Sequence, residues 1–484
     1  MSIRSFDLAA AAHQEMIDQG FHPDFPPAVE SQVQALKSQP TVPADGDVRD
    51  LLSLLWSSID NDTSRDLDQA EVAERVSGGI RVMVAVADVD ADVAIGSPID
   101  QYASYETTSV YTGVRTFSML PEALSTDLTS LNESADRVAV VIEYVVGPDG
   151  AIGSGAIYRA LVRNQAQLTY NGVGPWLEGT APPPPKVAAS DALQQQLKLQ
   201  DEAAQLCRAE RHKLGALDLD RVEPEAVVSN GQVEGISARR QNRASQLIEN
   251  FMVAANTVMA QTLMKAGVSS IRRIVKTPER WPRIVELARQ HGGNLPAEPD
   301  SGALNAFLQE RRAADPDHYA DVSLAVIKLM GPGEYVLSKP GGEQPGHFAL
   351  AAQDYTHSTA PNRRFSDTVT QRLIKSVLAK APAPYSDGQL DAIARNCTLK
   401  EDAARKVERK MNKRIAAVAL AHRVGETFAG VVTGVTPKGV FVRVLGPPAE
   451  GILIHGEQGV DVGDRFNVKL VHTDPERGYL DFSR

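Results

Sequence analysis

The stretch that decides the fold is SSIDNDTSRDLDQAEVAERV, residues 57–76. Four aspartates fall within nine residues, directly after the apolar run LLSLLW: Asp60, Asp62, Asp66 and Asp68. Clustered carboxylates repel one another, so they lie in solvent, at a helix N-terminus or around a hard cation that offsets the repulsion. On spacing alone, a solvated acidic turn is as good an interpretation as a metal site.

Two metal sites are compatible with this spacing. Counting Asp60 as position 1 of a calcium loop puts oxygen-bearing side chains at positions 3, 5, 7, 9 and 12, the last being Glu71. Position 6 is Arg65, where the sharp turn of such a loop requires glycine. The alternative is Mg²⁺ for phosphodiester chemistry, which needs few carboxylates but also a separate cation for the phosphate.

A second polar segment supplies candidate cations: HFALAAQDYTHSTAPNRRFSDTVTQRLIKSVL, residues 347–378. Arg363 and Arg364 stand where a proline-broken loop enters a predicted helix, and arginines beside helix N–H groups make a good phosphate site. The alternative is that both arginines pair with Asp367 or with other surface acids. For these arginines taken alone, that alternative is the more common outcome.

Composition bounds the class of protein. The chain has 484 residues, enough for about three folding units, with 43% hydrophobic and 23% charged residues, as in globular proteins. Cys207 and Cys397 are too few and too far apart for a disulfide framework or a zinc site. With no signal peptide and no apolar run of about 18 residues, we expect a cytoplasmic protein without membrane segments.

Charge is segregated along the chain. The formal net charge of −11 excludes a wholly basic nucleic-acid coat protein. Residues 1–70 contain 12 acidic and 4 basic residues, whereas residues 239–283 contain 9 basic and 2 acidic residues. Residues 400–423 add eight Lys or Arg against three Asp or Glu. This distribution favours a polyanionic strand led along a basic path towards an acidic end.

Periodicity predicts mixed secondary structure. A helix is expected after Pro26–Pro27, others over 245–267 and about 398–423, and strands between about 50 and 145. The last sixty residues contain five short apolar runs separated by Gly, Pro and Asp, which predicts a small antiparallel barrel.

The two polar segments together resemble one family. IDNDTSRDLDQA is similar to the aspartate signature of the RNB catalytic domain of the ribonuclease II and ribonuclease R family, and YTHSTAPNRRFSDTVTQRL resembles its arginine segment. TFSMLPEALSTDLTSL (116–131), KLGALDLDRVEPEA (213–226) and LIENFMVAAN (247–256) match in order. The resemblance implies an α+β fold: a small helical element over 1–48, an RNB domain over 49–424 with a mixed sheet surrounded by helices, and an OB-fold barrel over 425–484.

The resemblance also implies an activity. Members carry out Mg²⁺-dependent, processive 3′→5′ hydrolysis of single-stranded RNA and release nucleoside 5′-monophosphates. The implied metal ligands are Asp60, Asp66, Asp68 and Gln69, with one or two Mg²⁺ ions. The implied catalytic residues are Asp66, Asp68, Tyr111 and Arg363. The implied RNA-binding residues are Tyr111, Arg363, Arg364, Glu408, Phe441 and His455.

The chain departs from the family pattern at several points. Gln69 replaces the fourth aspartate, so weaker metal binding or a shifted ligand set, with Asp66 or Asp62 compensating, is expected. Lys276 stands where relatives carry an aromatic that clamps bases, and nearby Trp281 is a candidate substitute. Asn250 replaces a glutamate. About fifty N-terminal residues are too few for the usual paired cold-shock barrels, so we expect duplexes to meet a less obstructed entrance.

Two classes of function therefore compete. The main expectation is a monomeric exoribonuclease acting on single-stranded RNA. The alternative is an RNA-binding protein on an RNB scaffold whose catalysis is weakened because Gln69 replaces the fourth aspartate.

Overall fold

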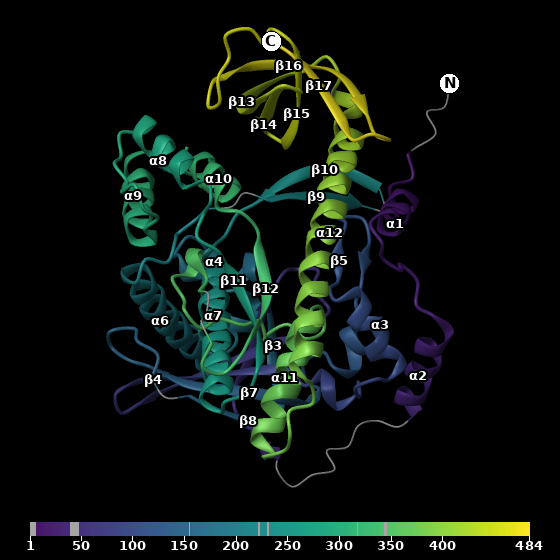
Figure 1. The fold of residues 1–484 in the computed structure, drawn as a ribbon, viewed down its shortest axis with the longest axis vertical. Helices are drawn as coiled ribbons and strands as arrows, with labels where there is room; N and C mark the ends of the chain where they lie inside the picture. The colour runs from purple at the N-terminus through teal and green to yellow at the C-terminus, as the bar shows by residue number, and fades with distance from the viewer. Residues whose placement is uncertain are drawn as a thin grey trace.

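The computed structural model describes residues 6–38, 48–153, 155–220, 223–229, 232–316, 318–342 and 346–484 (Figure 1). The predicted N-terminal element thus lies in part outside the described residues, at 1–5 and 39–47. Across these described ranges, no helix combines the length and the apolar character that crossing a bilayer requires.

A mixed six-stranded sheet forms the centre of the molecule, as predicted. Its strands, in the order β1-β8-β2-β3-β4-β7, are β1 (Val48–Asp50), β8 (Ala156–Thr169), β2 (Trp56–Asp60), β3 (Gln69–Val76), β4 (Gly79–Ala87) and β7 (Asp136–Val146). The pairs of β8 with β1 and β2 are parallel and the others antiparallel. Because β7 also pairs with the first half of β8, the strands from β8 to β7 form a closed ring.

Alternation along these strands separates two apolar surfaces. Inside the ring, Trp56, Val72, Met83 and Val141 belong to one buried cluster. The outer side packs on helices through a larger cluster that includes Val84 and Ile142. These helices are α4 (Tyr170–Leu177), α5 (Pro185–Ala188), α6 (Asp191–Lys213), α7 (Arg243–Lys265) and α11 (Phe365–Leu378).

One long helix, α12 (Asp387–Leu420), runs the length of the molecule (Figure 1). It begins eleven residues before the predicted start, because Ser386 and Gln389 form a capping box there. Helical spacing predicts an apolar stripe of Val407, Met411, Ile415 and Val418; the first three are buried, and Val418 is partly buried against the same cluster. The two-stranded sheet of β11 (Ser270–Val275) and β12 (Gly333–Ser338) packs on it.

Smaller elements surround this frame. Three helices with their own apolar cluster are α8 (Trp281–Gln290), α9 (Ser301–Ala314) and α10 (Tyr319–Met330). The hairpins are β5–β6 (Val110–Tyr111 and Thr116–Phe117) and β9–β10 (Glu223–Ser229 and Gln232–Arg239). Helix α3 (Pro98–Glu106) immediately precedes β5.

The C-terminal part is a closed five-stranded barrel, as predicted. Its strands are β13 (Thr427–Thr436), β14 (Gly439–Leu445), β15 (Pro448–His455), β16 (Arg465–Asp474) and β17 (Tyr479–Ser483). Four of the pairings are antiparallel and the β15–β17 pairing is parallel. Phe428, Leu453 and Phe482 pack with Leu420 at the end of α12, so the barrel is seated on that helix.

Two helices precede the sheet, α1 (Leu8–Asp18) and α2 (Pro27–Ser38). The second begins at the predicted prolines. Helix α1 lies against α12 and α2 against α3 (Figure 1).

Candidate active site

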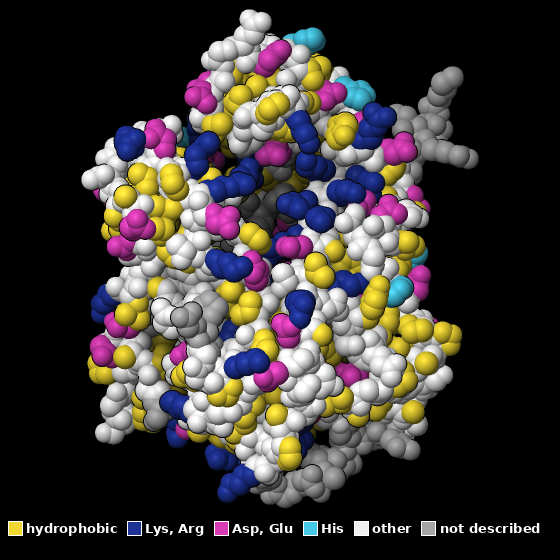
Figure 2. Space-filling view, in the orientation of Figure 1, with side chains coloured by type: hydrophobic (Ala, Val, Ile, Leu, Met, Phe, Trp, Pro, Cys, Tyr) yellow, Lys and Arg dark blue, Asp and Glu magenta, His cyan; other side chains and the backbone are white. Residues whose placement is uncertain are grey.

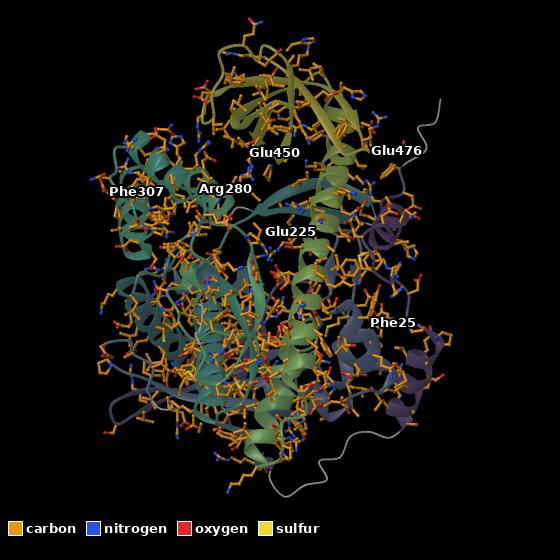
Figure 3. The ribbon with its side chains drawn as sticks, viewed as in Figure 1. Phe25, Glu225, Arg280, Phe307, Glu450 and Glu476 are labelled. Atoms are coloured by element: carbon orange, nitrogen blue, oxygen red, sulfur yellow. The ribbon has the colours of Figure 1, made fainter. Side chains whose placement is uncertain are left out.

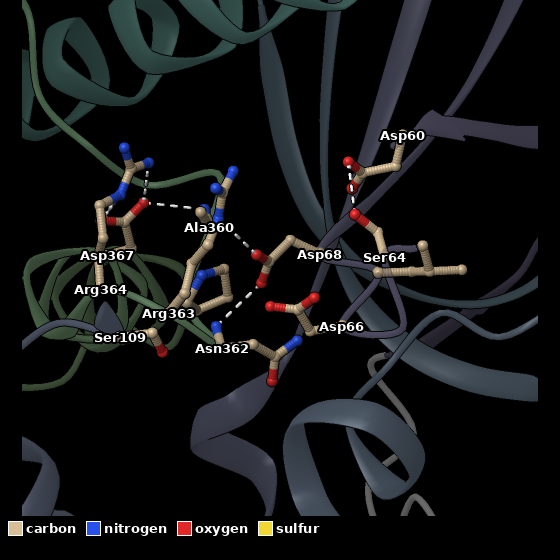
Figure 4. A network of polar contacts seen from close by, with 12 residues as sticks. Asp60, Ser64, Asp66, Asp68, Ser109, Ala360, Asn362, Arg363, Arg364 and Asp367 are labelled. Carbon is tan, nitrogen blue, oxygen red and sulfur yellow. Dashed lines mark hydrogen bonds and ion pairs between the residues drawn. The ribbon is translucent and has the colours of Figure 1, made fainter. Parts of the chain in front are cut away.

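The aspartate segment connects two neighbouring strands. Asp60 is the last residue of β2 and Gln69 the first of β3, so Asp66 and Asp68 lie in the loop between them. Strands flank this loop where helices flank a calcium loop of the EF-hand type, which argues against the calcium interpretation. The Asp60 carboxylate accepts hydrogen bonds from the Asn61 backbone N–H at 2.7 Å and from Ser64 Oγ at 3.0 Å (Figure 4).

Asp68 meets the arginine segment. Its side chain is 1% exposed and accepts a hydrogen bond from the Asn362 backbone N–H at 2.9 Å. Arg363 Nε lies 3.3 Å from Asp68 Oδ2 (Figure 4). Burial raises the pKa of Asp68 to about 7, and Asp66 contributes to the rise while Arg363 opposes it. The two segments, nearly 300 residues apart in sequence, thus build one site.

Tyr111 joins Asp66 to the long helix. Its hydroxyl donates to Asp66 Oδ2 at 3.2 Å, and its backbone N–H donates to Glu408 Oε1 of α12 at 3.2 Å. The residues before Tyr111 run beside the arginine segment. The Ser109 N–H donates to the Arg363 carbonyl at 3.0 Å, and Thr108 forms an isolated antiparallel β-bridge with Arg364. Tyr111 is 41% exposed, so its ring remains accessible to a substrate.

The two arginines have different environments. Arg364, the residue before α11, donates through Nε and Nη2 to the fully buried Asp367 at 2.9 and 2.7 Å. This is the ion pair considered as the alternative in the sequence analysis. Arg363 keeps 47% of its side chain exposed while it faces Asp68. The Arg363 guanidinium therefore remains partly accessible to solvent beside Asp68, whereas the Arg364 guanidinium is held by Asp367 (Figure 4).

A cavity of about 570 Å³ opens beside this site. Asp60 and Arg363 line it together with further arginines: Arg208, Arg211, Arg239 and Arg240. Arg239 Nη1 donates to Asn61 Oδ1 at 2.6 Å, which ties β10 to the aspartate loop. Figure 2 shows a hollow below the barrel with Lys and Arg side chains gathered around it. Its surroundings are cationic, as a path for a polyanion requires.

The comparisons with known proteins agree with this geometry. The RNB domain model matches residues 48–380, and the model of the RNase II-type exonuclease C-terminal S1 domain matches residues 426–484. The chain belongs to the RNB family. The mixed sheet with helices and the C-terminal OB-type barrel implied by the sequence resemblance are thereby confirmed.

Curated relatives of this RNB chain are ribonucleases R. That of Escherichia coli is 29% identical over 504 residues, covering 95% of this chain and 60% of the relative. That of Mycoplasma pneumoniae is 30% identical over 418 residues, covering 82% and 55%. The chain therefore spans about 60% of the length of the E. coli relative and somewhat less of the M. pneumoniae one.

Solved structures share the fold. RNase R of Mycoplasma genitalium in complex with ribose-methylated single-stranded RNA has a TM-score of 0.88 at 24% identity, covering 99% of this chain and 78% of that one. The same protein in complex with double-stranded RNA has a TM-score of 0.85 at 25% identity, covering 99% and 83%. Yeast Ssd1, described as a pseudonuclease, has a TM-score of 0.70 at 16% identity, covering 98% and 58%.

The donor atoms of this RNB site suit Mg²⁺. Carboxylates from Asp60, Asp66 and Asp68 and the amide of Gln69 are hard oxygen ligands. Among the described residues, no three His, Cys, Asp or Glu side chains are placed to hold an ion by themselves. Mg²⁺ retains waters and is bound through one or two carboxylates plus substrate phosphate, so a complete protein cage is not required. The residues present fit such an ion.

Glu71 is an acid of this region that the sequence analysis used only for the calcium alternative. It lies opposite Ser57 in the β2–β3 pair and is fully buried. Within the described part of the chain, both its carboxyl oxygens lack a hydrogen-bond partner. Burial, and then the charge of Asp60, raise the pKa of Glu71 well above its usual value. Burial thus disfavours the charged form of Glu71 that would be needed to replace the carboxylate missing at Gln69.

Other predicted residues lie apart from the aspartates. Phe441 on β14 and His455 on β15 belong to the barrel, which lies apart from the central sheet that carries β3 (Figure 1). Lys276 is exposed and pairs with Glu334 at 2.8 Å. Trp281 is 2% exposed and donates to the Pro296 carbonyl at 2.9 Å, so its suggested role as a substitute base clamp is wrong. It belongs instead to the core of the α8–α10 group.

Sequence reasoning missed one contributor to the RNB site, Asn362, and considered another, Ser64, only as position 5 of the calcium loop. Asn362 acts through its backbone N–H on Asp68, and Ser64 through its hydroxyl on Asp60. Both lie inside segments that the sequence analysis quoted. Only Ser64, an oxygen donor four residues after Asp60, carried a signal in its residue type. Asn250, in place of the expected glutamate, accepts a hydrogen bond from Arg211 Nη1 at 2.7 Å.

Proposed function

We propose that this protein is a processive 3′→5′ exoribonuclease that hydrolyses single-stranded RNA with Mg²⁺ and releases nucleoside 5′-monophosphates. One observation carries the proposal. Asp66, Asp68, Tyr111 and Arg363 come from three separate segments and converge within hydrogen-bond or ion-pair distance. Buried acids beside an exposed arginine at the end of a cationic cavity are what phosphodiester hydrolysis of a strand requires.

We assign Asp60, Asp66, Asp68 and Gln69 to one or two Mg²⁺ ions. When bound, the metal supplies a hydroxide nucleophile at neutral pH and offsets charge on the attacking and leaving oxygens. Asp68 and Asp66 hold the negative charge that such an ion needs, and Asn362 fixes the orientation of Asp68 through its backbone N–H.

Arg363 and Tyr111 act on the RNA. The permanently charged guanidinium of Arg363 binds the scissile phosphate and stabilises the charge that develops on it. The Tyr111 hydroxyl, a donor to Asp66, orients the 3′-terminal nucleotide, and Glu408 holds the backbone of Tyr111 from α12 and faces the same end. The Arg364 guanidinium is paired with Asp367. Arg364 therefore contributes to RNA binding through its backbone rather than through its side chain.

The single strand is held by the parts around the cavity. Arg239 and Arg240 line it, and Figure 3 shows Glu225, Arg280 and Glu450 on three sides of the region between the β9–β10 hairpin, the α8–α10 group and the barrel. On the barrel, Phe441 and His455 stack on bases, a sequence-tolerant contact. We assign residues 1–48 to a helical element, residues 49–424 to the catalytic domain and residues 425–484 to the RNA-binding barrel.

The decisive experiment is digestion of a 5′-labelled single-stranded RNA with Mg²⁺. Conversion of full-length RNA into a short labelled end product without intermediates, with 5′-monophosphates released, is the expected result. The Asp68→Asn variant is expected to bind the RNA with similar affinity and to leave it uncut. Labelled mononucleotide at the earliest time points, or equal cleavage by the variant, contradicts the proposal.

The second candidate function is RNA binding without efficient hydrolysis, and Gln69 favours it. An amide contributes oxygen but no charge, so metal affinity is reduced. The Gln69→Asp variant separates the two functions. If the wild-type protein is inert and the variant cuts RNA, the scaffold is catalytically decayed; if both cut, the exoribonuclease proposal holds.

We also propose that the protein is a cytoplasmic monomer. Both cysteines are free and buried, which suits a reducing compartment. Light scattering after gel filtration, with and without RNA, tests the monomer: a mass near 52.1 kDa is expected for the free protein.

A further inference from the structure

The N-terminal helix packs on the two elements that hold Tyr111. One apolar cluster joins α1 and the turn after it to the β5–β6 hairpin and to α12. Its buried members are Leu8, Ala12, Met16, Phe21, Val110, Phe117, Ala404, Val407, Met411 and Ile415. Val110 directly precedes Tyr111, and Val407 directly precedes Glu408, which accepts the Tyr111 N–H. The same cluster therefore supports both ends of that hydrogen bond.

Polar contacts also fix α1 and the turn after it to α12. Glu15 is 2% exposed, and its carboxylate accepts from Lys410 Nζ at 2.6 Å and lies 3.5 Å from Arg414 Nη1. Lys400 Nζ donates to the Gly20 carbonyl at 2.6 Å. A buried carboxylate held by two cations allows the helix little freedom to slide along α12.

A second anchor acts on the chain that enters the hairpin. His22 donates to Glu106 Oε1 through both its backbone N–H and Nδ1, each at 3.0 Å, and its carbonyl accepts from Tyr102 at 2.5 Å. Glu106 is the last residue of α3, and Thr107 then takes φ +58° to start the run past Arg363 to Tyr111. His22 thus holds the point from which the Tyr111 segment departs.

The hairpin itself lies close against α12. Gly113, in the turn between β5 and β6, has φ +78°, and a Cβ added there would come within 2.8 Å of Ile415 Cδ1. Val110 pairs with Phe117 and Tyr111 with Thr116, so the hairpin is only two pairs long. Such a short hairpin is not stable by itself and depends on what packs against it.

From these contacts we propose that residues 8–22 are a positioning element for Tyr111. They clamp the β5–β6 hairpin between α1 and α12, so that the Tyr111 hydroxyl remains at Asp66 and its N–H at Glu408. Met16 and His22 are the positioning residues at the two anchors. The consequence for catalysis rests on the proposed function, whereas the clamp itself does not.

The first test compares two neighbouring residues of α1. Met16 is 2% exposed and Ile17 is 47% exposed, so Met16→Ala removes packing under the hairpin and Ile17→Ala is the matched control. In Met16→Ala we expect faster amide exchange at 108–117, and kcat lowered about tenfold because the tyrosine is misplaced, with RNA affinity within twofold. His22→Ala should do the same through the other anchor, and Ile17→Ala should do neither.

A double-mutant cycle tests whether the effect passes through Tyr111. In a Tyr111→Ala background, adding Met16→Ala should change kcat less than twofold. An undiminished, multiplicative loss in that background overturns the proposal.

Amide hydrogen exchange tests the clamp independently of the proposed enzymatic activity. The wild-type protein need not hydrolyse RNA for this test. Faster amide exchange at 108–117 in both Met16→Ala and His22→Ala supports the clamp, provided that the thermal stability of the remainder of the protein is unchanged. Unchanged exchange in both variants overturns it, whatever the activity.

Discussion

At the scale of single residues, the site concentrates buried acid around one exposed cation. Asp60 and Asp68 both have a raised pKa, with burial as the first cause in each. Arg363 opposes the rise in both carboxyls but is itself half exposed. The fold thus buries carboxylates whose negative charge a proton or a bound cation would offset, and such arrangements are typical of functional sites.

Asp68 gives a pH prediction for the metal-free protein. Its folded-state pKa of about 7 lies above the ordinary 3.8, so the folded protein binds the extra proton between these values. Stability contributed by Asp68 is therefore lost as pH rises from about 4 to about 7. In EDTA, Asp68→Asn should gain in Tm relative to wild type over this window, by circular dichroism. Parallel pH curves would show that Asp68 titrates normally.

The adjacent arginines give a second prediction, because Arg364 donates twice to its buried acid, at 2.9 and 2.7 Å, whereas Arg363 lies 3.3 Å from Asp68 and is half exposed. Arg363→Ala should lower kcat by about 10²–10³-fold, as removal of a group that stabilises developing charge does, and should cost less stability than Arg364→Ala because Asp68, with a pKa of about 7, can take up a proton. Arg364→Ala leaves the fully buried Asp367 without its cation and should cost about 3 kcal/mol of unfolding free energy. Urea unfolding and single-turnover rates on both variants distinguish them; equal effects would contradict the assignment.

At the scale of elements, patterns within one segment were predictable and contacts between segments were not. The strand over Gly79–Ala87 follows from a continuous run of apolar residues, and the stripe Val407, Met411 and Ile415 follows from helical spacing. The start of α12 at Asp387 was missed because its first turns are polar and only the Ser386 capping box marks them. No spacing rule brings Tyr111 to Glu408 across 297 residues.

Side-chain orientation was the other limit. Trp281 and Lys276 lie five residues apart, and the sequence does not say which faces the substrate path. Trp281 is enclosed by the α8–α10 core, whereas Lys276 is exposed. The packing of the α8–α10 helices decides which of the two side chains is exposed. The family resemblance aligns residue positions but does not show where each side chain points.

The hairpin gives a prediction at this scale. Gly113→Ala places a methyl group against Ile415 at a backbone conformation with φ +78°, which L-residues rarely adopt. We expect about 1–2 kcal/mol of lost stability and lower kcat on short RNA. The control is Gly78→Ala, where φ is +93° but nothing lies within 4 Å. A similar drop of kcat in both variants would indicate backbone strain rather than displacement of Tyr111.

At the scale of the whole molecule, charge and stacking are divided between regions. The barrel is nearly neutral, with six Lys or Arg and eight Asp or Glu over 426–484, whereas arginines line the cavity. Salt should therefore weaken RNA binding through the cavity, and base stacking should dominate at the barrel.

This division is testable with two variants. Phe441→Ala should raise the Kd for a long RNA by about 5- to 100-fold, the loss expected for one stacking contact, without changing the salt dependence. Arg240→Ala should reduce the slope of log affinity against log salt by about 0.7, the value for one phosphate on a single strand. Arg395→Ala, which removes an exposed arginine paired with Asp391 on α12, is the control. Fluorescence anisotropy at several salt concentrations measures all three.

The closed ring of strands in the RNB domain fixes how its loops are spaced. Strand β8 pairs with β7 along its first half and with β2 along its second, so β2, β3, β4, β7 and β8 share one closed set of hydrogen bonds. A slip of one residue in any pair would have to be matched around the circle, and it would also turn apolar side chains to the wrong face. The register of β2 and β3 therefore sets the separation of Asp60 from Gln69. The two ends of the loop that carries Asp66 and Asp68 are thus held at a fixed distance from each other.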